Sequence, residues 1–281
     1  MKLATVAIDG RTTWGIVEGE TFLDVGAALK ARYADLKAAI GAAFAGVADA
    51  KSSAAAVPTS KVTWLPVIPN PDKILCVGLN YETHRKETGR AEVDHPTIFS
   101  RYANSQTGHL QPIVRPRVST HLDFEGELAV IIGKAGRYIS RVDAMDHVVG
   151  YSCYNDGSIR DFQRHTHQFT PGKNFPDTGA FGPWMMTPDE LGPLGELKLQ
   201  TRLNGQVMQE ALIKQMIFDI PRQIEYCSTF TRLEPGDVIV SGTPGGVGAR
   251  REPPLWMKPG DVVEIEVERL GVLRNVVTDE T

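Results

Sequence analysis

Three carboxylates stand at the ends of two apolar segments of the sequence. Glu125 and Glu127 directly precede the apolar run 128–132, and Asp156 closely follows the apolar run 148–153. In an extended strand, residues two apart point to the same face, so the two glutamates project together. Carboxylates beside a core strand repel one another and lose solvation unless a cation compensates them. If the two strands are neighbours, the pattern predicts an all-oxygen site for Mg2+ or Mn2+, with Ca2+ also compatible. The alternative is an exposed acidic pair, with Asp156 capping the next turn.

A histidine and a glutamate have the spacing of one helical face. His84 lies three residues before Glu87 in a polar stretch with helical character. Residues at this spacing meet on a helix, so Glu87 can orient the imidazole and raise its basicity. The alternative is a solvated helix, which the neighbouring charges favour. We also predict that segment 81–94 is a lid that closes over a bound substrate.

Further polar residues in later loops are candidates for substrate contact. Lys173 can stabilise an enolate or bind a carboxylate, although its sequence context is also that of an ordinary loop lysine. Arg160 and Gln163 follow Asp156 and can contact substrate or support the metal site; a salt bridge on a helix face explains Arg160 equally well. Thr243 lies in a glycine-rich loop whose backbone N–H groups can bind the substrate carboxylate. We interpret His165 and His167 as surface or substrate-proximal residues, not as metal ligands.

The elements that position these residues are mostly strands. Buried strands are predicted at 74–78, 128–133, 148–153, 237–241 and 262–268, and an Asn-Gly turn at 204–205 predicts a hairpin. Helices are few: an alanine-rich stretch from residue 25 to about 45 and a later helix at 219–229. We therefore predict a mixed α/β, mostly β fold. A small N-terminal α+β unit at 1–66, ending in a linker at 46–60, would precede a catalytic domain at 67–281.

Composition excludes several classes of partner. Thirty basic and 34 acidic residues give a net charge of -4, which provides no electrostatic footprint for nucleic acid. No uncharged apolar run approaches the roughly 20 residues that span a bilayer, and the start of the chain lacks a signal-peptide pattern. Three widely spaced cysteines fit neither a disulfide framework nor a zinc knuckle. We therefore expect no membrane contact and a cytoplasmic location.

Six motifs in order give the chain its resemblance to a known family. They are Gly78-Leu-Asn-Tyr-Glu-Thr-His84, Asp123-Phe-Glu-Gly-Glu127, Asn155-Asp-Gly-Ser-Ile-Arg-Asp-Phe-Gln163, Lys173-Asn-Phe175, Phe181-Gly-Pro183 and Gly242-Thr-Pro-Gly-Gly-Val-Gly248. With these motifs the chain resembles the fumarylacetoacetate hydrolase family over roughly residues 69–277.

The resemblance implies a compact β-roll, a homodimer, and Mg2+ or Mn2+ held by Glu125, Glu127 and Asp156. One departure is visible, because Arg101 stands where many members carry lysine.

The resemblance also implies an activity. We expect hydrolysis of a carbon–carbon bond in a 2,4-diketo acid of the acylpyruvate or fumarylacetoacetate type. His84, oriented by Glu87, would activate water, and Lys173 would stabilise the enolate that leaves. The alternatives are decarboxylation, tautomerisation or isomerisation of a 2-oxo acid, such as oxaloacetate or an intermediate of aromatic catabolism. A non-catalytic protein that binds metal or carboxylates is the alternative from another class.

Overall fold

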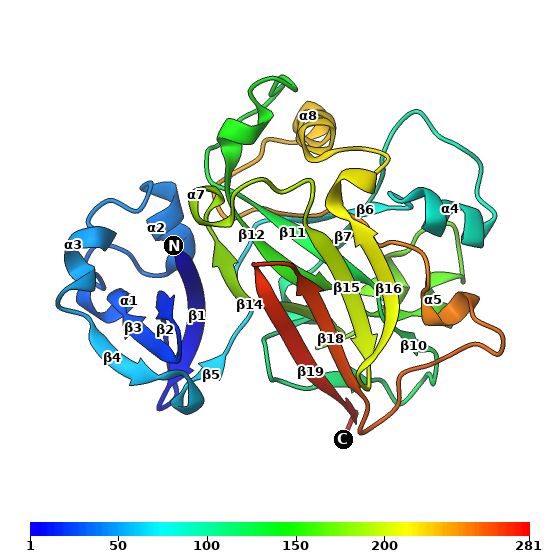
Figure 1. Cartoon of the computed structure of the whole chain (residues 1–281), viewed down its shortest axis with the longest axis horizontal. Helices are drawn as coiled ribbons and strands as arrows, with labels where there is room; N and C mark the ends of the chain where they lie inside the picture. Colours follow the sequence, from blue (N-terminus) through cyan, green and yellow to red (C-terminus); the bar gives the residue numbers. More distant parts are fainter.

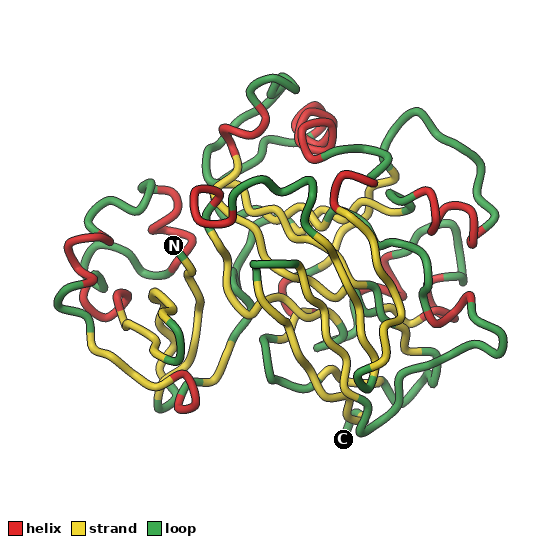
Figure 2. The backbone as a smooth tube through the Cα atoms, viewed as in Figure 1, coloured by secondary structure: helices red, strands yellow, loops and turns green.

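A computed structural model describes all residues from 1 to 281. The chain is built around one large mixed sheet, with a smaller sheet packed against part of it (Figure 1). The backbone is mostly strand and loop, with short helices at the periphery (Figure 2). This agrees with the mostly β fold predicted from the sequence. No helix of the structure is long and apolar enough to cross a membrane.

The large sheet has twelve strands and the smaller one has five. The large sheet runs in the order β4-β3-β2-β1-β14-β12-β11-β17-β6-β7, with β5 paired to β1 and β8 to β14. Its strands are β1 Lys2–Ile8, β2 Arg11–Glu18, β3 Thr21–Asp24, β4 Ala55–Pro58, β5 Thr63–Trp64, β6 Ile74–Gly78, β7 Thr97–Arg101, β8 Gln106–Thr107, β11 Gly126–Ile132, β12 Val148–Asn155, β14 Gly179–Met186 and β17 Val238–Val240.

The smaller sheet runs in the order β16-β15-β18-β19-β9, and β10 pairs with β13 alone. These strands are β9 Ile113–Arg115, β10 Leu122–Asp123, β13 Ser158–Ile159, β15 Lys198–Leu203, β16 Gln206–Leu212, β18 Val262–Val267 and β19 Gly271–Asp279. The helices are α1 Val25–Ala28, α2 Leu36–Gly41, α3 Val47–Lys51, α4 Glu82–Thr88, α5 Arg160–Gln163, α6 Thr170–Lys173, α7 Pro188–Leu191 and α8 Ile220–Phe230.

Strand β11 is buried along its whole length because both of its faces are covered. Leu128 and Val130 belong to the core that includes the five-stranded sheet. Ala129 and Ile131 point the other way, into a second core shared with the N-terminal strands and helices. This explains why the strand has a continuous apolar sequence instead of the alternation of a half-exposed strand.

The N-terminal residues form a lobe of their own in Figure 1, but their strands continue the large sheet. Strand β1 pairs with β14, at Lys2 opposite Met186 and Leu3 opposite Met185. Leu3 also joins a core cluster that contains Ile131 of β11. Residues before and after position 66 therefore share both a sheet and a core.

Two N-terminal expectations differ from the structure. The predicted long helix is two short ones, α1 and α2, because Asp35 caps the start of α2 and positive φ angles at Ala43 and Phe44 follow its end. The segment predicted as a linker contains α3 and β4, and β4 pairs with β3 at the edge of the sheet. Short side chains and one proline gave this segment a linker-like composition although it is regular structure.

Candidate active site

The three predicted metal ligands converge at the end of β11 and β12. Gly126 lies opposite Asn155 in the antiparallel register, and the Asp156 backbone N–H donates to the Glu125 carbonyl at 2.9 Å. This pairing places Asp156 beside the glutamates, as the sequence predicted for neighbouring strands. Ligand oxygens of Glu125, Glu127 and Asp156 lie within 4.8 Å of one another, and all three residues are buried.

Gly126 allows the smaller sheet to approach closely between the two glutamates. A Cβ atom at this position would lie 2.0 Å from the Thr201 Oγ1 of β15. Any larger residue would therefore push the two sheets apart. The neighbour that Gly126 admits is therefore β15 of the smaller sheet.

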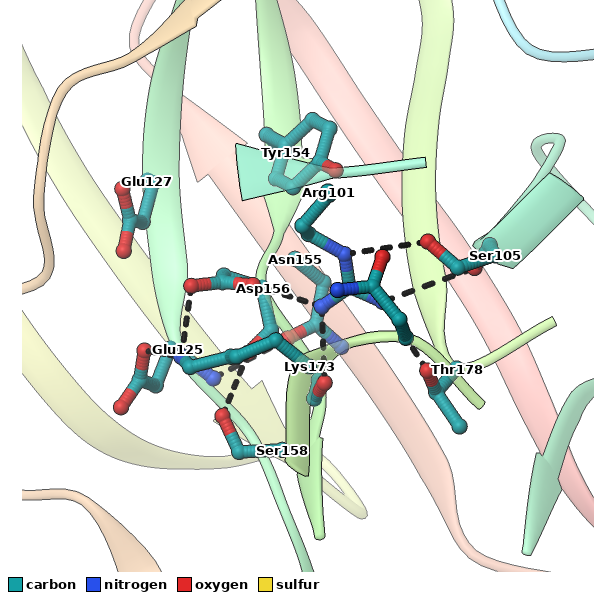
Figure 3. A network of polar contacts seen from close by, with 12 residues as sticks. Arg101, Ser105, Glu125, Glu127, Tyr154, Asn155, Asp156, Ser158, Lys173 and Thr178 are labelled. Carbon is teal, nitrogen blue, oxygen red and sulfur yellow. Dashed lines mark hydrogen bonds and ion pairs between the residues drawn. The ribbon is translucent and has the colours of Figure 1, made fainter. Parts of the chain in front are cut away.

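Two of the three carboxylates have cationic partners and the third has none. The Lys173 ammonium donates to Glu125 and Asp156, each at 2.6 Å, and Arg160 Nη1 lies 2.6 Å from Glu125. Figure 3 shows Lys173 between Glu125 and Asp156, whereas no dashed line reaches Glu127. Glu127 accepts a backbone hydrogen bond from Gly242 N–H at 2.5 Å.

The electrostatics of the site follow from these contacts. Burial opposes ionisation of Glu125, but Arg160 and Lys173 outweigh it and hold its pKa below the ordinary value. Burial, together with the charges of Asp156 and Glu125, raises the pKa of Glu127 well above the ordinary value. Burial tends to lower the pKa of Lys173, but Asp156 and Glu125 raise it, so the ammonium stays charged.

These residues fit a divalent cation. The donors are carboxylate oxygens without sulfur or imidazole, which is the set that Mg2+, Mn2+ and Ca2+ prefer. Glu127 has no cationic side chain within ion-pairing distance, and its raised pKa shows that its ionised form is disfavoured without a cation. A bound cation would stabilise the ionised carboxylate, because an unpaired charge in a buried site is costly.

Arg101 lies behind Asp156 and outside the pocket, so it is not placed to contact a substrate. Its guanidinium is buried, and it donates to Asp156 Oδ1 at 2.6 Å, the Gly157 carbonyl at 2.8 Å and Thr178 Oγ1 at 2.9 Å. The residue does not line the pocket. Arg101 therefore orients Asp156 from behind, which the sequence comparison with lysine-containing relatives left undecided.

The predicted pair of His84 and Glu87 is formed. His84 Nδ1 lies 2.6 Å from Glu87 Oε1, and the imidazole is buried. Glu87 Oε2 accepts from Gly246 N–H at 2.8 Å, so one carboxylate joins α4 to the glycine-rich loop. The Thr83 hydroxyl accepts from Gly245 N–H at 3.0 Å and adds a second link.

These links anchor the first part of segment 81–94, which the prediction of a lid treated as unanchored. Tyr81 is only 1% exposed, and residues 81–88 are attached to the glycine-rich loop. Residues 89–95, in contrast, are all exposed. The polar sequence of α4 suggested mobility because its anchoring partners lie about 160 residues away and are invisible in a local pattern.

Thr243 lies in the pocket, but its hydroxyl is already used. It donates to the Gly126 carbonyl at 3.0 Å and accepts from Gln209 Nε2 at 2.8 Å. Gly242, just before it, has a φ of 106°, and a Cβ there would lie 2.5 Å from Asn80. The hydroxyl thus fixes the loop instead of presenting a free donor to substrate.

Asp123 is an important residue that the sequence did not single out. It is fully buried and accepts from Arg160 Nε at 2.7 Å, Gly248 N–H at 2.8 Å and Ala249 N–H at 3.0 Å. It therefore ties Arg160 to the glycine-rich loop. Its position two residues before the first glutamate, inside the quoted motif, was the available signal.

The guanidinium of Arg160 is held in place so that one of its nitrogens can contact a ligand. Besides Asp123 and Glu125, it donates from Nη1 to Gln163 Oε1 at 2.9 Å, and its Nη2 atom is buried without a partner. The unpaired nitrogen is a donor that a substrate oxygen can satisfy.

A single pocket of about 380 Å³ connects these groups. Its lining includes seven of the nine predicted site residues, and Asp156 is buried behind it. The lining residues from that set are His84, Glu125, Glu127, Arg160, Gln163, Lys173 and Thr243, with Glu87 reaching the pocket only through His84.

The fold and site define a class: a mostly β protein with a buried all-oxygen acidic cluster at the base of a polar pocket. Residues 73–278 match the family model described as fumarylacetoacetate (FAA) hydrolase C-terminal. The chain belongs to the fumarylacetoacetate hydrolase family, as its motifs indicated.

Relatives and solved structures place the chain within this family. It is 43% identical to the mitochondrial oxaloacetate tautomerase FAHD2A of Bos taurus over 223 residues, which are 79% of this chain and 71% of the relative. A fumarylacetoacetate hydrolase from Exiguobacterium antarcticum has a TM-score of 0.88 at 34% identity, with full coverage of both chains.

A third similar protein was solved with ligands. Maleylpyruvate hydrolase from Sphingobium sp. SYK-6, in complex with manganese(II) and pyruvate, has a TM-score of 0.83 at 26% identity, again with full coverage of both chains. Family members similar to this chain thus include tautomerases as well as hydrolases.

Proposed function

We propose that this chain is a divalent-metal-dependent tautomerase or isomerase of a 2-oxo acid of the oxaloacetate type. The observation that carries the proposal is the pocket, in which a buried acidic cluster and a histidine–glutamate pair face one cavity. The tautomerase name of relatives at 43% identity favours this reaction over the hydrolysis that we expected from the sequence. Carbon–carbon hydrolysis therefore becomes the second candidate.

Glu125, Glu127 and Asp156 would hold Mg2+ or Mn2+. When bound, such an ion polarises a keto oxygen as a Lewis acid and thereby acidifies the neighbouring carbon. Arg101 would keep Asp156 in position from outside the pocket. Gly242 N–H would do the same for Glu127.

His84 is the proposed proton carrier. Its Nδ1 is engaged by Glu87, so Nε2 is the ring nitrogen left to exchange a proton with the substrate. In the keto-to-enol direction Nε2 takes a proton from C3, and the imidazolium then gives a proton to the C2 oxygen; ketonisation reverses both transfers. Glu87 stabilises the imidazolium formed in between.

Arg160 and Lys173 are the proposed anion-binding groups. The unpartnered Nη2 of Arg160 can donate to the C1 carboxylate, and Gln163 keeps the guanidinium oriented. The charged ammonium of Lys173 stabilises negative charge that develops on the C2 oxygen. The loop around Thr243 closes the pocket wall beside them.

The test is a comparison of three reactions by one preparation of the protein. Enol–keto interconversion of oxaloacetate, decarboxylation of oxaloacetate and cleavage of acetylpyruvate are measured with Mn2+ and with a chelator. We expect metal-dependent interconversion to be fastest, and His84→Ala to slow it by about 10²–10⁴-fold. Cleavage of acetylpyruvate at a higher rate would instead establish the hydrolase, and binding without any turnover would establish a non-catalytic protein.

Hydrolysis stays a candidate for a specific reason. The same imidazole that exchanges a proton with carbon can deprotonate water, and a maleylpyruvate hydrolase is among the similar structures. The homodimer and the cytoplasmic location remain predictions; the FAHD2A relatives are named as mitochondrial.

A further inference from the structure

The outer part of the pocket is lined by arginines that have no acidic partner. Arg164 directly follows α5 as its C-cap residue, and Arg250 ends the short 3-10 turn Gly248–Arg250 that follows the glycine-rich loop. Both line the same pocket as the acidic cluster, and both are exposed to it. No carboxylate oxygen lies within 4.0 Å of either guanidinium.

The nearby acids are hydrogen-bonded to other groups and lie beyond ion-pairing distance of Arg164 and Arg250. The Ser119 hydroxyl donates to the Asp161 carboxylate and lies 2.8 and 2.9 Å from its two oxygens. Asp123 is used by Arg160 and the glycine-rich loop. Burial and then the charges of Arg250 and Arg160 lower the pKa of Arg164, and these effects outweigh the opposing charges of Asp123 and Asp161.

The geometry points to a subsite for a second carboxylate: we propose that Arg164 and Arg250 bind the distal carboxylate of a 2-oxo dicarboxylic acid. The inference rests on the proposed function, because the 2-oxo acid end would lie at the acidic cluster. Arginine suits this role since its planar fork can hold a carboxylate through two hydrogen bonds. The two residues come from separate elements, so a carboxylate between them would accept hydrogen bonds from two sides.

The size of the pocket agrees with an extended ligand. Its volume of about 380 Å³ lies in the range of pockets that hold whole small molecules, and it spans from Glu125 and Lys173 to Arg250. Arg90 lines it too, from the exposed segment 89–95, whereas Arg164 and Arg250 end ordered helical turns. These two residues are therefore the ones to test.

The test uses ligand pairs that differ only at the distal end. Dissociation constants of 2-oxoglutarate and 2-oxovalerate, and of 2-oxoadipate and 2-oxohexanoate, are measured by calorimetry with Mg2+ present. In the unaltered protein we expect the dicarboxylate of at least one pair to bind about tenfold or more tightly than its monocarboxylate partner. In Arg164→Gln/Arg250→Gln this ratio should fall to about one, through loss of dicarboxylate affinity.

Two further variants separate charge from fold. Arg269→Gln removes an exposed arginine outside the pocket and should leave the ratio unchanged. Arg164→Lys/Arg250→Lys keeps the charges and should restore part of the preference. A ratio near one in the unaltered protein, or an unchanged ratio in the double glutamine variant, would overturn the subsite. Absence of binding by both members of each pair would instead contradict the proposed function of the acidic cluster.

Discussion

Glu127 is the residue whose substitution tests the proposed metal site most directly. It is buried beside two other carboxylates and has only a backbone donor, Gly242 N–H. A neutral glutamine can accept the same hydrogen bond but carries no charge to be compensated. The residue thus couples stability to metal binding.

We therefore predict opposite effects of Glu127→Gln with and without metal. In chelator, the variant should melt about 2–4 °C above the unaltered protein, which corresponds to about 1 kcal/mol, because a buried repulsion is removed. The stabilisation by Mn2+ seen in the unaltered protein should be lost. Thermal melting with Mn2+ and with chelator measures both effects, with Glu268→Gln as an exposed control. A variant that keeps the full Mn2+ stabilisation would remove Glu127 from the ligand set.

Arg101 acts through Asp156 and has its own prediction. Arg101→Lys keeps the charge but cannot reproduce the separate bonds to Asp156, Gly157 and Thr178. We expect metal affinity to weaken by about 10–100-fold while the ligands themselves are unchanged. Calorimetric titration of Mn2+ measures it, with exposed Arg117→Lys as the matched control. Equal affinity of Arg101→Lys and the unaltered protein would show that lysine orients Asp156 equally well.

At the scale of elements, α4 is fastened to the glycine-rich loop by two side chains. Thr83 and Glu87 accept from Gly245 and Gly246, and this fixes His84 before any substrate arrives. A preformed base needs no lid movement over residues 81–88. The exposed residues 89–95 are the part of the segment left free to move.

This arrangement predicts a pattern of amide hydrogen exchange. Without substrate, residues 85–88 should exchange slowly and residues 89–95 quickly. Thr83→Val should accelerate exchange at Gly245 and leave Gly246 nearly unchanged, because only the first acceptor is removed. Residue-resolved exchange by NMR measures both amides in one sample. Fast exchange throughout 81–94 would restore the lid that the sequence suggested.

A hydrogen bond between His109 and the smaller sheet makes the folding stability depend on pH. Its Nδ1 accepts from Arg274 N–H of β19 at 3.1 Å, a bond that requires the neutral imidazole. Burial and the Arg274 charge lower its pKa to about 4, from the ordinary value of 6.5. Between these values the unfolded chain takes up a proton and the folded chain does not.

Folding stability should therefore fall as pH falls from about 6.5 to about 4. His109→Asn keeps an acceptor oxygen near the same place but does not titrate, so the decline with pH should become shallower. Urea unfolding at a series of pH values measures the slope for both proteins. Parallel slopes would assign the acid sensitivity to other groups.

At the scale of the whole molecule, the N-terminal 66 residues complete a sheet and a core. Without them, β14 would lose its partner β1, and the core that contains Ile131 would be open on one side. An exposed strand edge beside apolar surface favours aggregation. The predicted division at residue 66 can be tested directly.

We expect residues 67–281 alone to aggregate or to lose cooperative unfolding. Size-exclusion chromatography and thermal melting of this fragment provide the measurement, and the full chain is the control. A monodisperse fragment that unfolds cooperatively and still binds Mn2+ would establish 67–281 as an independent domain.

The sequence by itself determined the strands, the motifs and the family. Strand patterns are local, so β6 matches its predicted bounds and β11, β12 and β18 lie within a few residues of theirs. The acidic cluster was also predictable, because same-face spacing on one strand and a short antiparallel connection to the next bring three carboxylates together. The motif order then pointed to the family that the comparisons support.

Only the tertiary structure decided what surrounds these residues. Arg101 and Asp123 act through partners 55 and up to 126 positions away, and no local spacing encodes such pairs. The same holds for Thr83 and Glu87, whose bonds to the glycine-rich loop anchor a helix that had no anchors in the local sequence pattern. Hydrophobic periodicity records burial along one element, whereas hydrogen bonds between distant elements depend on how the sheets pack.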